Sequence, residues 1–245
     1  MLYKYFSFKV YTVVIFVVAS HIAYGEEVES TSSKWNSELG LGYVNTTGNT
    51  QTESIKATAK TVHEEQQWRQ SAAIEALNAS ENDQTTAERY LLTGKIDYKY
   101  SKFNYWYFIA SYENDRFAGY DRRTSESVGY GRRLIENAAL TLDAEIGPGA
   151  RQTKFETGEQ TREFIGRVAG TLKWKISKSS DFGEEVSSEF GEKTTVTKSV
   201  TSLKASINSQ LAMKLSYTVK YTSDVPVDTK KTDTETVVTI VYNYH

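Results

Sequence analysis

Apolar and polar residues alternate along most of this chain, as in β-strands that have one apolar face. The last stretch, residues 234–245, shows the pattern clearly. One of its faces carries Thr236, Val238, Ile240, Tyr242 and Tyr244. A chain that ends inside a strand leaves an open sheet edge, and the first strand of the same sheet can cover that edge. The sequence therefore predicts a sheet that closes into a barrel.

The same alternation predicts eleven earlier strands and no helix. We expect them near residues 34–44, 52–63, 68–76, 89–100, 104–113, 124–135, 140–146, 163–176, 182–190, 200–207 and 213–221. In two of these ranges, 104–113 and 124–135, the pattern does not tell which face points inward. The predicted fold is all-β, a twelve-stranded antiparallel transmembrane β-barrel of the outer-membrane type.

The connections between these strands support a membrane barrel. Those near residues 64–67, 101–103, 136–138, 177–180 and 208–211 are short, whereas those near 45–51, 78–86, 114–122, 148–161 and 223–233 are mostly longer and polar. Short turns at one end and longer loops at the other are typical of outer-membrane barrels. A soluble sandwich has no reason to sort its connections in this way.

Aromatic residues gather at the two ends of the expected strands. One set comprises Trp35, Trp68, Tyr100, Tyr105, Trp174, Phe182, Tyr242 and Tyr244, and the other comprises Tyr43, Tyr90, Tyr112, Phe164, Phe190 and Tyr221. At ~3.3 Å per residue and a tilt of ~40° the sets are roughly 20–25 Å apart, close to the apolar band of membrane barrels. Aromatics also favour strands in general, but that preference does not explain why these avoid the strand middles.

The N-terminus has the features of a secretory signal peptide. Lys4 and Lys9 precede an apolar run over residues 10–20, and an A-x-G pattern ends at Gly25. We expect cleavage after Gly25, because the run is too short to span a membrane comfortably as an anchor. The predicted organisation is a signal peptide (1–25), a polar periplasmic leader (26–33) and the barrel (34–245).

Composition excludes several kinds of chemistry. The 245 residues include no cysteine, which excludes disulfides, thiol catalysis, Cys-ligated zinc and a lipid-modified N-terminal Cys. The formal charge is -2, and removal of the two signal-peptide lysines leaves 27 basic against 31 acidic residues. This balance gives no reason to expect a nucleic-acid partner.

Three stretches resemble a known family. They are Tyr-Glu-Asn-Asp-Arg-Phe-Ala-Gly-Tyr-Asp-Arg at 112–122, Gly-Tyr-Gly-Arg-Arg-Leu-Ile at 129–135 and Leu-Thr-Leu-Asp-Ala-Glu-Ile-Gly-Pro-Gly at 140–149. Together with Gly-Leu-Gly-Tyr-Val-Asn-Thr-Thr-Gly-Asn-Thr at 40–50, they make the chain similar to the salt-induced outer-membrane proteins, family 481 of the domains of unknown function.

The resemblance implies a barrel in the outer membrane of a Gram-negative bacterium and no established catalytic residues. The partners would be outer-membrane lipid, lipopolysaccharide and the barrel assembly machinery, with small ions or solutes as candidate cargo. Such proteins usually end in an aromatic residue, whereas here His245 follows Tyr244. Tyr242 and Tyr244 are the candidate assembly signal.

The sequence offers few candidates for catalysis or metal binding. The histidines at 21, 63 and 245 lie in the signal peptide, beside a short turn and at the terminus, so none suits a barrel hydrolase. Asp143 and Glu145 share the inward face of one strand, where an acid/base pair is the less expected alternative to ordinary lumen charges. Gly147-Pro148-Gly149 is expected to form a turn or a bulge, and no cofactor or metal-ligand cluster is expected.

One polar connection is a candidate ligand loop, because aromatic and arginine side chains together suit sugar or phosphate groups. Its family-motif residues are Asp115, Arg116, Phe117, Gly119, Tyr120, Asp121 and Arg122. The alternative is a structural loop in which arginines pair with carboxylates and Gly119 turns the chain.

The inward faces of the assignable strands predict a basic lumen. Twelve basic positions, Lys56, Lys60, Arg69, Arg89, Lys95, Lys99, Arg167, Lys173, Lys175, Lys204, Lys214 and Lys220, face six acidic ones, Glu38, Glu75, Asp97, Asp143, Glu145 and Glu163. The preferred function is a narrow pore or a solute- or salt-responsive channel with anion preference. A non-conducting structural or surface-interaction barrel is second. A lipid-modifying enzyme is a distant third, and we expect no enzymatic activity.

Overall fold

The computed structural model describes residues 34–47, 52–81, 84–115, 120–225 and 230–244. Its strands are β1 (Lys34–Thr47), β2 (Thr52–Glu64), β3 (Trp68–Glu81), β4 (Gln84–Lys99), β5 (Asn104–Asp115), β6 (Tyr120–Glu136), β7 (Leu140–Phe155), β8 (Gln160–Lys175), β9 (Ser180–Gly191), β10 (Thr195–Ser206), β11 (Leu211–Thr222) and β12 (Thr232–Tyr244). The predicted signal peptide, leader and His245 lie outside the described residues.

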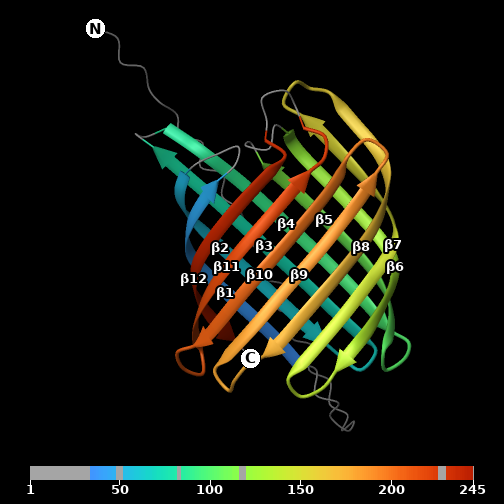
Figure 1. The fold of residues 1–245 in the computed structure, drawn as a ribbon, viewed down its shortest axis with the longest axis vertical. Coiled ribbons are helices and arrows are strands. Elements are labelled where there is room, and N and C mark those ends of the chain that lie inside the picture. Colours follow the sequence, from blue (N-terminus) through green and yellow to red (C-terminus); the bar gives the residue numbers. More distant parts are fainter. Residues whose placement is uncertain (1–33, 48–51, 82–83, 116–119, 226–229, 245) are drawn as a thin grey trace, which may run out of the picture. The chain divides into compact units, whose positions relative to one another are not determined.

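Each strand pairs antiparallel with its sequence neighbours, and β12 pairs with β1 to close the sheet into a barrel (Figure 1). The closing register sets Leu41 opposite Ile240 and Ser37 opposite Tyr244. This confirms the predicted twelve-stranded antiparallel barrel, in which the last strand is covered by the first. The described residues contain no helix long and apolar enough to cross a membrane.

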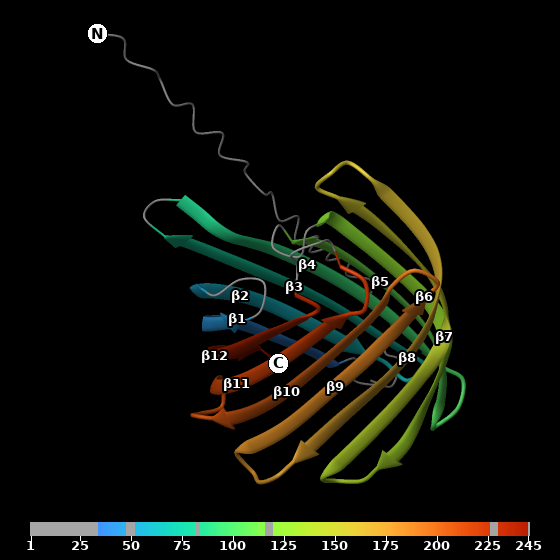
Figure 2. The same ribbon diagram turned by 45° about the horizontal axis from the view of Figure 1, so that its top comes forward.

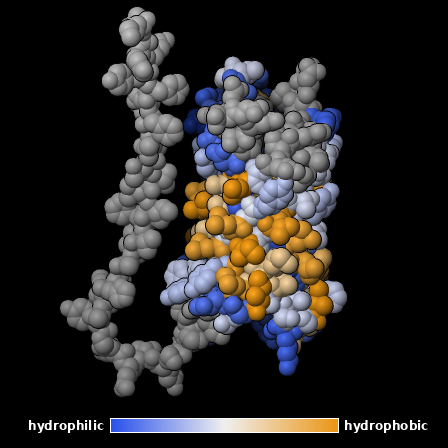
Figure 3. Space-filling view, turned by 90° about the vertical axis from the view of Figure 1, so that its left-hand side faces the viewer, coloured by the Kyte–Doolittle hydropathy of each residue, from blue (hydrophilic) through white to orange (hydrophobic). Residues whose placement is uncertain are grey.

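Along each strand, side chains alternate between an apolar outer face and a charged inner face. Leu41, Ile74, Leu92, Phe108 and Ile240 lie on the outside and are 43–66% exposed. On the face seen in Figure 3, hydrophobic residues form a band across the barrel between two hydrophilic ends. An apolar belt of this kind is what a membrane barrel presents to lipid.

We call the end with the short connections and both ends of the described chain the turn end, and the opposite end the loop end. Turn-end connections span residues 65–67, 100–103, 137–139, 176–179 and 207–210, as expected. Loop-end connections are shorter than predicted, because β3, β4, β6 and β7 continue through polar residues that we expected to be loops. Only the connection over residues 223–231 is long. The polar stretches of β3, β4, β6 and β7 are therefore strand ends that extend beyond the apolar band.

Gly147-Pro148-Gly149 lies inside β7, so the predicted turn or bulge is wrong. The pairs Ser127–Gly149 and Tyr130–Ile146 keep one register across it, and Pro148, which has no N–H, falls in the gap between them. The backbones approach closely here, since a Cβ on Gly147 would overlap the Val128 carbonyl oxygen.

The structure also assigns the faces of β5, the first of the two ambiguous strands. On β5, Tyr105 and Tyr107 point inward and are each 3% exposed, while Trp106 and Phe108 point outward. The expectation that Tyr105 belongs to an aromatic belt is therefore wrong. Trp106 takes that place on the outer face, where its ring lies 6.2 Å from the ring of Tyr100.

Candidate functional site: the barrel lumen

The inner faces of the strands form a lumen lined with charged side chains, and Figure 2 views the barrel toward its loop end. The register places the ten candidate lumen positions on these inner faces. They are Lys56, Lys60, Arg89, Lys95, Asp97, Asp143, Glu145, Arg167, Lys173 and Lys214. They do not form one cluster. Instead most of them divide between a packed wall on β3–β8, a network near the loop end and an open wall on β9–β11, and Lys60 and Lys173 lie beside the open wall.

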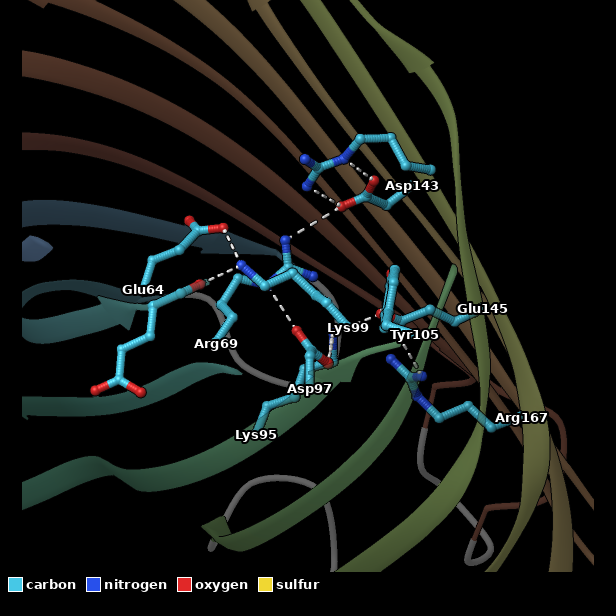
Figure 4. Close-up of polar contacts among 11 residues, drawn as sticks. Glu64, Arg69, Lys95, Asp97, Lys99, Tyr105, Asp143, Glu145 and Arg167 are labelled. Carbon is cyan, nitrogen blue, oxygen red and sulfur yellow. Dashed lines mark hydrogen bonds and ion pairs between the residues drawn. The ribbon is translucent and has the colours of Figure 1, made fainter. Parts of the chain in front are cut away.

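The packed wall is centred on Glu145 of β7, near the turn end (Figure 4). This carboxylate accepts hydrogen bonds from Lys95 Nζ at 2.5 Å, Arg167 Nη1 at 2.9 Å and the Tyr105 hydroxyl at 2.9 Å. Lys95 also lies 3.0 Å from Asp97. Glu145 and its two cations are thus satisfied by one another, which is the usual condition for burying charges.

A second set of ion pairs continues this wall toward the turn end. Arg69 Nε donates to Asp97 at 2.6 Å, and its Nη1 lies 3.5 Å from Asp143. Asp143 also accepts from Arg133 Nε at 2.9 Å. Asp143 and Glu145, considered above as an acid/base pair, are therefore each held by arginine or lysine partners, and their geometry is that of structural lumen charges.

Two tyrosines fill the space between these charges. Tyr105 and Tyr107 lie against Gly131 and Gly129 of β6, where a Cβ would overlap the ring of Tyr105 or come within 2.8 Å of Tyr107 Cε1. Arg167 lies over the Tyr107 ring, 5.2 Å from its centroid. The glycines give the rings room to lie flat on the wall, so this side of the lumen is closely packed.

Near the loop end, ion pairs join strands that are not paired with each other in the barrel. Glu235 of β12 is 4% exposed and binds Lys56 of β2 at 2.7 Å and Arg89 of β4. Lys220 of β11 reaches Glu113 of β5 at 2.7 Å and the Tyr120 hydroxyl at 2.8 Å. Since β5 and β11 lie on opposite sides of a twelve-stranded ring, the Lys220–Glu113 pair narrows the lumen.

Arg151 is the most deeply buried charge of the loop end, at 1% exposure. It binds Glu163 at 2.8 Å and Glu189 at 3.3 Å. A cavity of about 20 Å³ lies beside it, lined by Tyr120, Arg123, Lys220 and other residues. That volume holds about one water molecule, so the lumen is tight at this level.

The inner faces of β9, β10 and β11 differ from the rest of the lumen. No residue of β9 or β10 is buried, and on β11 only Ala212 is. Between their charged positions these strands present small and hydroxylated side chains inward, as at Ser187, Ser202, Ser216 and Thr218. Inward residues that remain accessible to water line open space, so the free part of the lumen lies along this wall.

Several lysines on or beside the open wall lack a carboxylate partner. Within the described chain, Lys173, Lys198 and Lys214 form no ion pair within 4 Å. On β10 and β11, Lys198 is directly opposite Lys220 and Lys204 directly opposite Lys214. Glu38 binds Lys204 at 2.8 Å. Like charges directly opposite one another repel, and Lys198 and Lys214 add positive charge to this wall without a carboxylate within 4 Å.

The sequence-based inventory missed several lumen residues. The structure adds the acids Glu113, Asp115, Glu185, Glu189 and Glu235, and the bases Arg123, Arg133, Arg151 and Lys198. The twofold excess of basic residues is therefore reduced. The alternation Glu185–Ser187–Glu189, opposite the face that carries Phe182, Val186 and Phe190, was a usable signal for the inward face of β9.

The remaining candidates are the family-motif residues and the two tyrosines of the assembly signal. Asp115 ends β5, and Tyr120, Asp121 and Arg122 begin β6, whereas Arg116, Phe117 and Gly119 lie outside the described residues. Tyr120 is buried in the lumen under Arg123, and Asp121 binds Lys154 at 2.8 Å. Tyr242 and Tyr244 lie on the outer face of β12, 40% and 66% exposed.

His63 stacks on Trp35 at 4.4 Å between ring centroids, on the outer face at the turn end. Within the described ranges no group of His, Asp and Glu side chains has an arrangement that could hold a metal ion.

A closed barrel with an apolar outer band and a charged lumen defines an outer-membrane β-barrel. Its fold is similar to that of the NanC porin, with a TM-score of 0.58 at 10% identity over 83% of this chain and 98% of that one. It is also similar to the translocator domain of the autotransporter NalP from Neisseria meningitidis, with a TM-score of 0.53 at 11% identity over 88% and 90%. At these identities the likeness shows the fold alone.

The sequence gives the family. Residues 39–244 match the model described as "Protein of unknown function, DUF481", so the chain belongs to that family. The uncharacterized protein YdiY of Escherichia coli (strain K12) is 26% identical over 219 residues, which cover 89% of this chain and 86% of the relative.

Proposed function

We propose that this protein forms a narrow, anion-preferring pore in the outer membrane of a Gram-negative bacterium. The passage follows the inner faces of β9, β10 and β11. The observation that carries the proposal is the contrast between this water-accessible wall and the packed wall opposite. The pore is off-centre, because the tyrosines and ion pairs of β3–β8 occupy the other side.

Anion preference follows from the charges along this path. Lys198 and Lys214 face the open space without carboxylate partners, and each lies opposite another lysine. In a narrow passage with low-dielectric walls an unpaired positive lining raises the local concentration of anions. The paired charges of the opposite wall contribute less to this potential, because each cation is offset by a nearby carboxylate.

The test is ion selectivity in planar bilayers under a salt gradient. We expect a small conductance and a reversal potential of the sign given by anion preference. Replacing either Lys198 or Lys214 with glutamate should reduce or invert that preference. The matched control is Lys178→Glu, the same charge change in an exposed turn outside the lumen. Cation preference in the unmodified protein, or equal effects of the lumen and turn variants, would refute the assignment.

The second candidate is a barrel that does not conduct and serves as a structural or surface-interaction protein. It is favoured by the tight loop end, where Arg151 is 1% exposed and the Lys220–Glu113 pair crosses the lumen. The absence of current from folded protein in the same bilayers would favour this candidate over the pore. A lipid-modifying enzyme gains no support, since Asp143 and Glu145 are tied into ion pairs.

A further inference from the structure

Lysine side chains gather on the inner face of the barrel toward the turn end. Five of them lie no more than four residues from the turn end of their strands. We call them the turn-end lysines: Lys60 of β2, Lys173 and Lys175 of β8, Lys204 of β10 and Lys214 of β11. They lie on or beside the open wall and place most of its positive charge toward the turn end.

The carboxylates of the same region do not balance these lysines. Glu38 binds Lys204 at 2.8 Å, and Glu185 lies 3.7 Å from Lys60. Asp181 is directly opposite Lys204 on the neighbouring strand. Three acids against five lysines leave an excess of two positive charges on this part of the inner face.

The carboxylates of the packed wall near the turn end are already in use. Asp97 is bound by Arg69 at 2.6 Å, and Asp143 is bound by Arg133 at 2.9 Å. Because each of these acids has a cation of its own, the packed wall does not offset the excess positive charge of the turn-end lysines.

Two of the turn-end lysines share a patch of the open wall with two hydroxyl groups. Lys204 and Lys214 are directly opposite one another on β10 and β11, and Ser202 and Ser216 form the next inward pair toward the loop end. Side chains in directly opposite positions have Cβ atoms about 4.5–5.5 Å apart. The two ammonium groups and the two hydroxyls are thus close together, and all four can donate hydrogen bonds.

Gly183 of β9 leaves room beside this patch. It is directly opposite Ser202 on one neighbouring strand and Lys173 on the other. A Cβ on this residue would lie 2.8 Å from the Ser202 hydroxyl oxygen, so a larger residue would crowd the hydroxyl. Without a side chain at this position, the surface between Lys173 and the patch stays open to a ligand.

This arrangement suits an anion with several charges. Like charges directly opposite one another destabilise a sheet, and a multivalent anion between Lys204 and Lys214 would offset that repulsion more than a monovalent one. The cations here are lysines, whose ammonium groups act as compact point charges with three rotatable donors. Such groups suit a phosphate, whose charge is spread over several oxygens, whereas flat carboxylates are matched best by the planar fork of arginine.

We propose that the turn-end lysines form a binding site for a multivalent, phosphate-type anion dissolved in the water of the lumen. Lys204 and Lys214 would bind the anion from one side and Lys173 from the other, with the Ser202 and Ser216 hydroxyls donating to its oxygens. This deepens the proposed function by naming the class of anion that the pore selects. It rests on that function for the passage of the anion and not for its binding.

Binding is tested by isothermal titration calorimetry on the detergent-solubilised barrel, after heat-modifiable gel mobility has shown that it is folded. Inorganic pyrophosphate, citrate and chloride are titrated at one ionic strength. We expect pyrophosphate to bind saturably at one site per chain and more tightly than citrate, and chloride to give no saturable signal. Citrate binding as tight as that of pyrophosphate would overturn the assignment to phosphate chemistry, and no saturable binding of pyrophosphate would overturn the site.

Two lysines can be replaced without leaving a carboxylate unpaired. Within the described chain, Lys173 and Lys214 form no ion pair within 4 Å. Lys173→Gln and Lys214→Gln should each weaken pyrophosphate binding severalfold in barrels that remain folded. The matched control is Lys178→Gln, which removes the same charge from an exposed turn outside the lumen and should leave binding unchanged. Equal weakening in all three variants would refute the site.

Conductance recordings separate this site from the pore itself. Pyrophosphate should reduce the chloride current through the unmodified barrel in planar bilayers, and Lys173→Gln should lessen that block. Saturable binding in detergent without any current would refute the pore and support the site. An anion-selective current that pyrophosphate does not reduce, from a barrel that does not bind it, would refute the site and support the pore.

Discussion

Glu145 provides a quantitative test of the packed wall. Glu145→Gln removes the charge that Lys95 and Arg167 share. Removing one partner of a buried ion pair typically costs about 3–5 kcal/mol, because an uncompensated charge stays behind. The lower part of this range applies here, since Lys95 keeps Asp97 at 3.0 Å and Arg167 keeps the Tyr107 ring. We expect the free energy of unfolding to fall by about 3 kcal/mol.

The matched control is Glu185→Gln, the same substitution on the open wall. Glu185 lies 3.7 Å from Lys60, and the two side chains are 56% and 46% exposed. Ion pairs this exposed contribute about 0–1 kcal/mol. Urea unfolding of the two variants in lipid vesicles, followed by tryptophan fluorescence, compares them directly. A similar loss in both variants would refute the division of the lumen into packed and open walls.

Three further expectations follow from the structure. Glu113→Gln should raise single-channel conductance, because it releases the Lys220 side chain that crosses from β11 to β5; an unchanged conductance would show that this pair does not limit the passage. Gly131→Ala should lower the thermal unfolding temperature by several degrees because its Cβ meets the Tyr105 ring, whereas Gly94→Ala, with open space around it, should have little effect. Deleting His245 should leave assembly intact and deleting Tyr244 with it should impair assembly, as judged from the heat-modifiable band; equal assembly would exclude recognition through the aromatic end.

The strand number and the closure could be predicted because they depend on local alternation. A strand with lipid on one side and the lumen on the other repeats its pattern every two residues, as on β8 and β11. The pattern fails where both faces have the same character. On β5, Tyr105 and Trp106 are both aromatic, and the inward choice depends on Gly131 of the neighbouring strand.

The charge network could not be predicted, because its members are far apart in the chain. Lys56 and Glu235 are separated by 179 residues and meet only because the barrel closes. Loop-end strand lengths were underestimated for a related reason. Beyond the apolar band both faces of a strand are polar, so residues such as Gln152 and Lys154 resemble a loop although their backbones are paired.

The most direct test of the pore is whether its passage follows β9–β11. Ser216→Cys places a thiol on the open wall, and Ser127→Cys places one on the packed wall, where Ser127 is 3% exposed. A charged, water-soluble thiol reagent is added during conductance recordings in planar bilayers. The structure predicts that the reagent reduces the current through Ser216→Cys and leaves Ser127→Cys unchanged. Block at Ser127→Cys alone, or no current from either folded barrel, would contradict a pore along this wall.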